Sequence, residues 1–228
     1  MYSRSTHTSR RFARRRRRLD RRFLLSGSSR SDMGEDMTIC DVLVIGAGPG
    51  GGNAALQCAR LGLDTILVED HDEIGTPVHC GECISDLACQ NLGLKLPEHV
   101  ISKSVKGIRV IFPDGTEKCL SEEGYVLEKH LFEQWIAESA VSEGARLCLS
   151  HKITGMQKSF EGKKFSGWLC EGKGDLFPIQ AKIVIDASGV SSVCSKLLDL
   201  NPRGKVVAGM QYELEGVPTD GYLDFYIW

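Results

Sequence analysis

Residues 41–69, DVLVIGAGPGGGNAALQCARLGLDTILVE, constrain the fold more than any other part of the chain. A short apolar run leads into Gly46, Gly48 and Gly51, which form the pattern G-x-G-x-x-G. In a strand–turn–helix unit the first glycine permits a tight turn and the second lets the backbone approach a pyrophosphate. The third lets the helix pack on the strand. A glycine-rich turn without a ligand is the alternative, and the residues that follow disfavour it.

Those residues complete the context of a dinucleotide site. Pro49 and Gly50 open a helix expected over residues 49–61, whose N–H groups and positive dipole end would face the phosphates. A second strand is expected over residues 65–68, and Glu69 ends it. A carboxylate at this distance from the turn can accept hydrogen bonds from a pair of ribose hydroxyls. The segment therefore predicts a Rossmann-type nucleotide-binding unit.

The charge of the chain is unevenly distributed. The net charge is −2, but residues 1–37 contain 11 Arg and 4 acids, which leaves −9 on the remainder. An acidic folded part does not favour nucleic-acid binding, and no apolar run is long enough to span a bilayer. The 9 cysteines are mostly isolated, match no disulfide framework and fit a reducing cytoplasm.

The Arg-rich residues 1–36 form a distinct segment that lacks the apolar surface needed to order itself. A basic arm for RNA or anionic lipid and a transit peptide are two interpretations. We favour a third, in which this extension is not native and Met33 or Met37 initiates the protein.

Hydrophobic periodicity and turn residues predict the remaining elements. Pro113-Asp114-Gly115 and residues 172–175 predict two hairpin turns. Residues 181–186 read as a buried strand, and Leu131, Trp135, Ala137 and Val141 as the apolar stripe of a helix. Helices are expected over residues 84–92, 128–142 and 191–200. Strands are expected over residues 105–112, 116–120, 145–149, 153–158, 164–171, 176–180, 181–186, 206–214 and 222–226.

This order of elements favours an α/β fold in which antiparallel strands interrupt a Rossmann domain. An NAD dehydrogenase would continue with regular βαβ units, so the layout favours a two-domain flavoprotein. We expect a nucleotide-binding domain over residues 37–204 and the first strands of an antiparallel substrate domain over residues 205–228. Because the chain stops inside an expected strand, we interpret it as a C-terminally truncated piece.

Five further segments carry a family resemblance: LVE at 67–69, IGTPVHCGE at 74–82, VLEKHLFEQW at 126–135, IDASGVSS at 185–192 and QYELEGV at 211–217. With the glycine motif, they resemble the geranylgeranyl reductase family of flavoproteins, and within it the archaeal digeranylgeranylglycerophospholipid reductases. The P-V-x-C-G-E part is much more specific than the glycine motif. The resemblance implies a fold like that of p-hydroxybenzoate hydroxylase, FAD as cofactor, and reduction of isolated C=C bonds in isoprenoid chains.

Site residues follow from the same resemblance. Cys80 would lie near the isoalloxazine and the reacting alkene, where a protonated thiol can supply a proton at low cost in an apolar tunnel. A buried structural cysteine is the alternative. Glu69 would hold the adenosine ribose. The other expected contacts to FAD are Gly46, Gly48, Pro49, Gly50, Gly51, Cys80, Gly81, Lys129, Asp186 and Gly189.

The chain departs from the family pattern at three places. Cys83 replaces a glycine and creates C-x-x-C with Cys80, which could be a redox pair, although without further ligands we predict no metal site. Lys129 replaces an arginine and offers a phosphate only a point charge. Ser188 stands where an Ala-Asp-Gly pattern has its carboxylate, and the group that replaces this carboxylate is left open. Family members also continue with a Gly-Asp motif and a lipid tunnel, so we expect this piece alone to be inactive.

Other polar and aromatic residues carry weaker signals. His79 reads as a loop residue rather than a proton relay, and Glu82 fits a local ion pair and a role in proton supply equally well. Trp135 is expected in the core, and His130 and His151 are expected at the surface.

The resemblance implies an FAD-dependent reductase that acts on geranylgeranyl chains of isoprenoid lipids. The implied partners are a lipid substrate, peripheral contact with a membrane, and an electron donor that could be ferredoxin, a nicotinamide or a deazaflavin. The alternatives are a thiol–disulfide oxidoreductase using Cys80 and Cys83, an aromatic hydroxylase of the same fold, and an inactive nucleotide-binding fragment or basic-tailed binding protein.

Overall fold

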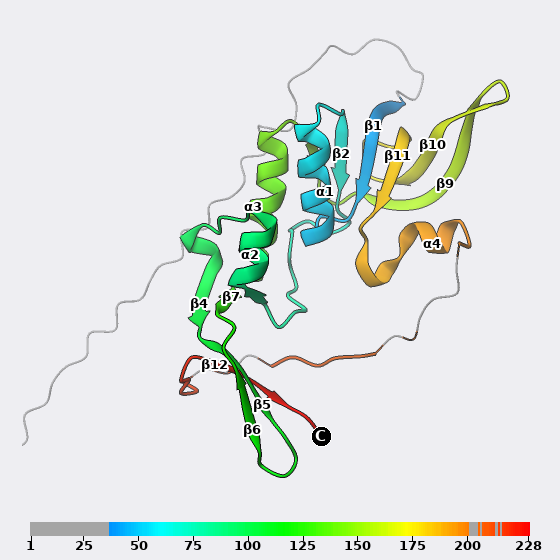
Figure 1. Ribbon diagram of the computed structural model, residues 1–228. Helices are drawn as coiled ribbons and strands as arrows, with labels where there is room; N and C mark the ends of the chain where they lie inside the picture. Colours follow the sequence, from blue (N-terminus) through cyan, green and yellow to red (C-terminus); the bar gives the residue numbers. More distant parts are fainter. Residues whose placement is uncertain (1–36, 201–204, 206, 213, 215) are drawn as a thin grey trace, which may run out of the picture. The chain divides into compact units, whose positions relative to one another are not determined.

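The computed structural model describes residues 37–200, 205, 207–212, 214 and 216–228. The expected α/β class with a Rossmann-type sheet is confirmed (Figure 1). The main sheet has the order β8-β2-β1-β11-β10-β9. The first four strands are parallel to one another, and β10 is antiparallel to both of its neighbours, β11 and β9. Its strands are β1 (Thr38–Ile45), β2 (Thr65–Val68), β8 (Arg146–Cys148), β9 (Lys152–Glu161), β10 (Lys164–Lys173) and β11 (Ile179–Asp186).

Strand β1 lies in the middle of this sheet, between β2 and β11, and its apolar residues are buried on both faces. Leu43 and Ile45 join one core cluster, and Val42 and Val44 join the other. The parallel pairing of β1 with β11 runs from Thr38 opposite Ile179 to Ile45 opposite Asp186. The two strands therefore end together, and the glycine turn after β1 meets the loop after β11.

Helices cover the two faces of the sheet unequally. Helix α1 (Pro49–Arg60) and helix α3 (Lys129–Ser142) contact each other and bury alanines against the face of Val42 and Val44. Gly52 permits this close approach, because a Cβ there would lie 2.8 Å from Ile136 Cγ2. The short helix α4 (Val193–Leu197) packs Cys194 into the cluster on the other face.

Two three-stranded sheets accompany the main sheet. One has the order β3-β7-β4, and its core includes Val100 and Leu127. The other has the order β12-β5-β6. Here Arg109 on β5 forms ion pairs with Asp224 on β12 and with Asp220, both at 2.7 Å. The strands of these two sheets are β3 (Cys83–Ser85), β4 (Ile101–Val105), β5 (Gly107–Ile111), β6 (Glu117–Leu120), β7 (Gly124–Leu127) and β12 (Tyr222–Tyr226). Helix α2 (Asp86–Leu92) and the 3-10 turn η2 (Glu98–Val100) lie between β3 and β4 in the sequence.

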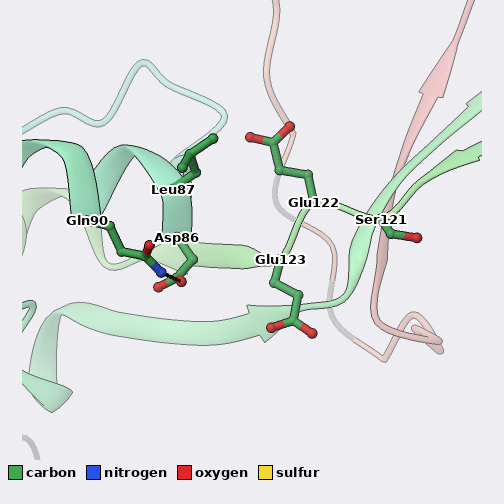
Figure 2. Close-up of a pocket in the computed structure, with 6 residues that line it drawn as sticks. All are labelled: Asp86, Leu87, Gln90, Ser121, Glu122 and Glu123. Carbon is green, nitrogen blue, oxygen red and sulfur yellow. Dashed lines mark hydrogen bonds between the residues drawn. The ribbon is translucent and has the colours of Figure 1, made fainter.

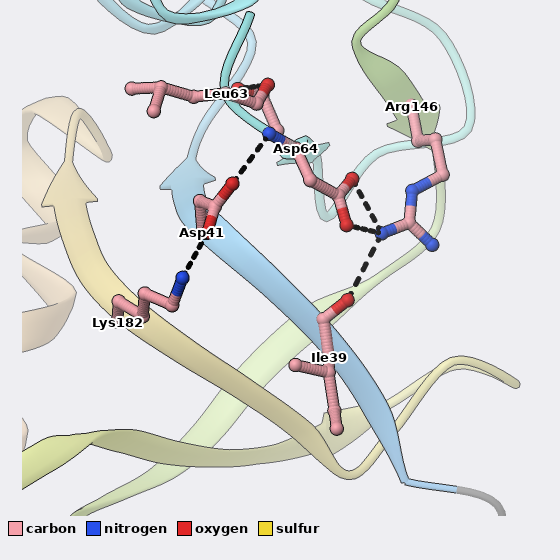
Figure 3. A network of polar contacts seen from close by, with 7 residues as sticks. Ile39, Asp41, Leu63, Asp64, Arg146 and Lys182 are labelled. Carbon is pink, nitrogen blue, oxygen red and sulfur yellow. Dashed lines mark hydrogen bonds and ion pairs between the residues drawn. The ribbon is translucent and has the colours of Figure 1, made fainter.

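A polar network ties the main sheet together toward the start of β1, away from the glycine turn (Figure 3). Asp41 accepts the backbone N–H of Asp64 at 3.0 Å and pairs with Lys182 of β11 at 2.6 Å. Arg146 of β8 pairs with Asp64 at 3.0 Å and donates to the carbonyl of Ile39 at 3.3 Å. These contacts connect β1, β8 and β11 with Asp64, the residue before β2.

The hairpin expected around residues 172–175 is confirmed in its pairing, because β10 and β11 are antiparallel with Cys170 opposite Ile179, but its loop lies at residues 174–178. A second hairpin, which was not expected, joins β9 to β10 with its tight turn at Gly162 and Lys163, where Gly162 has φ +61°. Residues 176–180 form no separate strand, because Ile179 already begins β11 and pairs with Thr38. The glycine-rich stretch is a loop between two strands of the main sheet. The hairpin expected at Pro113-Asp114-Gly115 is confirmed as β5–β6.

Four other expectations need correction. Residues 84–92 begin as β3, and α2 starts only at Asp86, where Ser85 Oγ caps the helix by accepting the N–H of Ala88 at 3.2 Å. The helix expected over residues 191–200 is the 3-10 turn η3 (Gly189–Ser191) followed by the short α4. The described residues between 205 and 214 form no strand. Ile183, expected in a buried strand, is 55% exposed because β10 pairs only with the first part of β11.

The expected domain boundary stays a prediction, but one pairing bears on it. β12 lies parallel to β5, so one small sheet combines strands from both expected domains. Within the described part of the chain, no helix has the length and apolar character needed to cross a membrane. The Arg-rich extension lies outside the described residues.

The glycine turn allows a direct test of the fold. A Cβ on Gly51 would lie 1.8 Å from the carbonyl oxygen of Gly46, whereas a Cβ on Gly50 meets nothing within 4 Å. We expect Gly51→Ala to lower the free energy of unfolding by about 1–3 kcal/mol or more, because backbone must move. Gly50→Ala, the matched control, should be neutral or slightly stabilising. Urea unfolding of both variants measures this, and equal stabilities would contradict the packing described.

Candidate functional site

The glycine turn presents the geometry of an anion site. Gly46 has φ +95°, and a Cβ there would lie 2.7 Å from the carbonyl oxygen of Ala187. Gly48 is the residue before α1 and Pro49 is its first residue, with no side chain capping this helix end. The N-terminal N–H groups of α1 are therefore not satisfied by a side-chain cap, which is the arrangement that binds phosphates.

Glu69 ends β2 beside this turn. Its Oε2 accepts the N–H of Ala47 at 2.7 Å, and its Oε1 lies 2.6 Å from Nδ1 of His71. The side chain is only 13% exposed. The structure thus places a fixed carboxylate next to the turn, as the sequence predicts for a ribose contact.

Lys129, the first residue of α3, is joined to the same turn through Glu133. The Lys129 Nζ and Glu133 Oε1 form an ion pair one helical turn apart. Among the described residues, Glu133 is the one charged side chain that is buried, at 5% exposure. Its Oε1 lies 3.9 Å from where a Cβ on Gly48 would be, and its Oε2 lies 2.8 Å from that position on Gly75. A buried ion pair therefore lies against the second glycine of the motif.

Asp186 and Gly189 occupy the loop that meets the glycine turn from β11. Asp186 accepts hydrogen bonds from Ser188 and, at 2.7 Å, from the N–H of Cys194 in α4. Burial alone would raise the pKa of Asp186, but these hydrogen bonds outweigh it and hold the pKa below its usual range. Ser188 Oγ accepts the N–H of Val193 at 2.9 Å. Ser188 and Asp186 therefore both accept hydrogen bonds from the start of α4.

Cys80 lies in a loop that four hydrogen bonds hold. Its N–H donates to Gln211 Oε1 at 3.1 Å, and its sulfur accepts the N–H of Glu82 at 3.4 Å. Glu82 has φ +61°, unusual for a residue other than glycine. Its carbonyl accepts from Leu127 at 2.7 Å, and its carboxylate accepts the N–H of Lys129 at 3.3 Å. Glu82 is therefore a local anchor that fastens the Cys80 loop to the start of α3.

Cys80 and Cys83 lie on opposite edges of one peptide unit. Cys80 Sγ accepts the N–H of Glu82, while Cys83 Sγ donates to the carbonyl of Gly81 at 2.9 Å. The N–H and C=O of a trans peptide point in opposite directions. Both thiols are free, and a disulfide would require this peptide to rearrange. Burial also raises the pKa of the Cys83 thiol, which disfavours the thiolate needed for disulfide exchange.

A surface hollow on another part of the chain lies between α2 and residues 121–123 (Figure 2). Asp86, Leu87 and Gln90 of α2 face Ser121, Glu122 and Glu123 across it. No residue of the expected site lines this hollow, and its carboxylates would repel a pyrophosphate. The geometry therefore favours the glycine turn as the nucleotide site.

Several residues lie differently from expectation or were not singled out. The side chain of His151, expected at the surface, is only 10% exposed, because its ring packs on Phe177 and bonds to Leu149 and Asp175. The apolar stripe of α3 is also shifted, since Phe132, Ile136, Ala137 and Ala140 are buried and Val141 is exposed. His130 and Trp135 are half-buried, and His79 is exposed.

Glu133, Gln211 and His71 lie in the site but are not among the residues expected there from the sequence. Glu133 carried one available signal, a carboxylate four residues after Lys129 on the face that α3 buries. Gln211 contacts Cys80 across 131 positions in the sequence, and no local pattern predicts such a contact.

The residues present fit the adenosine and pyrophosphate half of FAD. The close fit of Gly51 against Gly46 leaves the start of α1 free of side chains, and Glu69 supplies an acceptor beside it. Lys129 is the nearby cation. These features would hold the two phosphates and the ribose, and none of the described contacts blocks the turn itself.

The buried ion pair gives a second prediction. Lys129→Met would leave the Glu133 carboxylate buried without a cation, and we expect a loss of about 1–3 kcal/mol in the free energy of unfolding. The double variant Lys129→Met/Glu133→Gln should recover part of this loss. Arg60→Met, which breaks the exposed pair with Glu143 between α1 and α3, is the control and should cost less than about 1 kcal/mol. Urea unfolding of the FAD-free protein measures all three, and a double variant no more stable than Lys129→Met would contradict the assignment.

Comparison with known proteins finds relatives over most of the chain. A digeranylgeranylglycerophospholipid reductase of Methanothermobacter thermautotrophicus is 34% identical over 202 residues, which cover 83% of this chain and 50% of the relative. The solved structure of a geranylgeranyl bacteriochlorophyll reductase-like protein from Thermoplasma acidophilum matches with TM-score 0.72 and 32% identity, over 84% of this chain and 51% of that one. A flavin-dependent brominase matches with TM-score 0.58 and 23% identity, over 70% of this chain and 40% of that one, and shows the shared fold.

The chain thus spans about half the length of the relatives it matches. The family model of FAD-dependent oxidoreductases matches residues 41–196, which run from the first strand through α4. FAD, the cofactor expected from the sequence, is the cofactor of this family. The chain belongs to the FAD-dependent oxidoreductase family.

Proposed function

We propose that this chain is the nucleotide-binding part of an FAD-dependent reductase that saturates C=C bonds of geranylgeranyl chains in isoprenoid lipids. The observation that carries the proposal is the placement of Cys80. A half-buried free thiol lies in a loop fastened through Glu82 to the start of α3, where Lys129 stands beside the glycine turn. The similarity to archaeal lipid reductases over most of the chain supports the same conclusion.

Each residue of the site has a role in this proposal. Gly46, Gly48, Pro49, Gly50 and Gly51 hold the pyrophosphate, with Lys129 as counter-charge. Glu69 holds the adenosine ribose. Gly81, Asp186 and Gly189 complete the cofactor contacts, and Asp186 does so while it fixes the loop that supports the turn.

The chemistry requires one hydride and one proton for each double bond. Reduced FAD supplies the hydride when it is bound. Cys80, a free thiol, supplies the proton to the other alkene carbon. The thiolate left behind then takes a proton from solvent. An apolar substrate requires this step to occur in a dry environment, where a neutral thiol costs little to bury.

The substrate also determines where the protein works. A geranylgeranyl lipid lies in a membrane, so we place the protein in the cytoplasm, at the membrane surface. Reducing equivalents come from an external donor, and ferredoxin, NAD(P)H and a reduced deazaflavin are the three donors to compare.

The test uses the protein encoded by the gene that carries this sequence. Purified protein should show the visible bands of bound flavin, which bleach with dithionite and recover when a geranylgeranyl lipid is added without oxygen. Cys80→Ser should keep the flavin bands and slow this recovery by about 100-fold or more, since a general acid typically contributes that much. Cys83→Ser, the neighbouring control, should leave the recovery rate within about twofold of the parent.

Each failure points to a different part of the proposal. A colourless protein would refute FAD binding. Bound flavin that reoxidises with a disulfide, or with oxygen and an aromatic substrate, would indicate one of the alternative reactions. An unchanged rate in Cys80→Ser would remove Cys80 from the mechanism while keeping the reductase.

A further inference from the structure

Both carboxylate oxygens of Glu69 are already engaged. Oε2 accepts the N–H of Ala47 at 2.7 Å. Oε1 accepts the backbone N–H of His71 at 3.2 Å and lies 2.6 Å from Nδ1 of its ring. A pair of ribose hydroxyls that approaches Glu69 therefore meets one oxygen joined to the glycine turn and one covered by an imidazole.

The imidazole of His71 is the group that can move away from Glu69. The His71 side chain is 57% exposed, and its ring contacts only the Glu69 carboxylate and, at 3.1 Å, that of Asp70 among the described polar partners. Its backbone is fixed separately, because its carbonyl accepts the N–H of Ser150 at 2.9 Å. Glu69, in contrast, is held between β2 and the turn. A rotation of the His71 side chain would free Oε1 without moving Glu69.

We propose that His71 competes with the adenosine ribose of FAD for Glu69: its ring occupies the Glu69 carboxylate in the free protein, and the ribose displaces it on binding. This inference rests on the proposed FAD site. FAD binding is then coupled to the protonation of His71, because the ring loses its carboxylate partner when the ribose takes its place.

The charges around His71 determine the sign of this coupling. The hydrogen bond to Glu69 raises the pKa of His71 above its ordinary value, Asp70 raises it further, and Lys152 of β9 opposes both. Lys152 itself pairs with Asp70 at 3.0 Å. The ring of His151, the residue before β9, bonds instead to Leu149 and Asp175. Loss of the Glu69 contact lowers the pKa of His71, so FAD binding releases a proton and tightens as the pH rises.

Isothermal titration of FAD into the flavin-free protein tests this coupling. Titrations between about pH 5.5 and 8, in buffers of different ionisation enthalpy, count the protons released. We expect release at the acidic end and an affinity that rises with pH until His71 is neutral. His71→Ala should abolish the release and tighten FAD binding about threefold at the acidic end, as an exposed contact of this kind allows. At the alkaline end the variant and the parent protein should converge.

Controls separate this inference from the proposed function. His99→Ala, which removes an exposed histidine on η2, should behave like the parent protein. ADP, which carries the adenosine ribose and a pyrophosphate, should release the same proton as FAD. FAD binding without proton release, or weaker binding by His71→Ala, would overturn the role of His71 and leave the FAD site intact. Absence of FAD binding at every pH would overturn both.

Discussion

The structure depends on the close contact between the glycine turn and the end of β11. Gly51 packs on the carbonyl of Gly46, and Gly46 packs on the carbonyl of Ala187. No side chain fits at either position, so the start of α1 can approach the sheet only if β1 and β11 end at the same level. The register from Thr38–Ile179 to Ile45–Asp186 supplies this alignment. The polar network of Asp41, Asp64, Arg146 and Lys182 holds it from the opposite direction.

A second constraint is electrostatic. Glu133 places a buried negative charge against Gly48, where the proposed ligand brings two more. A buried carboxylate is costly without a partner, so Lys129 has to neutralise it whether or not a phosphate is present. Where the family pattern has arginine, a lysine in an i,i+4 pair still satisfies Glu133. The Lys129 ammonium offers a phosphate fewer hydrogen-bond donors than an arginine would. The lysine therefore still neutralises Glu133 inside the fold, but it binds a phosphate of the cofactor less specifically.

Local patterns allowed the nucleotide-binding half to be predicted, because its signals are close together in the sequence. The strand before the turn, the helix after it, the strand over residues 65–68 and the hairpin at Pro113-Asp114-Gly115 all follow from periodicity and turn chemistry. The failures arose where a distant partner decides the outcome. Ile179 is part of β11 because it pairs with Thr38 of β1. The local sequence of residues 172–180 does not predict this pairing. The contact of Gln211 with Cys80 and the burial of His151 under Phe177 are likewise products of tertiary structure.

Neighbouring residues form a series that connects the two ends of the proposed site. His71 bonds to Glu69, Glu69 to the glycine turn at Ala47, and Gly48 lies against Glu133. Glu133 then pairs with Lys129, whose N–H meets Glu82, whose own N–H reaches Cys80. In the proposed site, this order follows the groups of FAD from ribose through pyrophosphate toward the flavin. The same series explains why Glu82 accepts an unfavourable backbone conformation, since it is the residue at which the cofactor half and the Cys80 loop are joined.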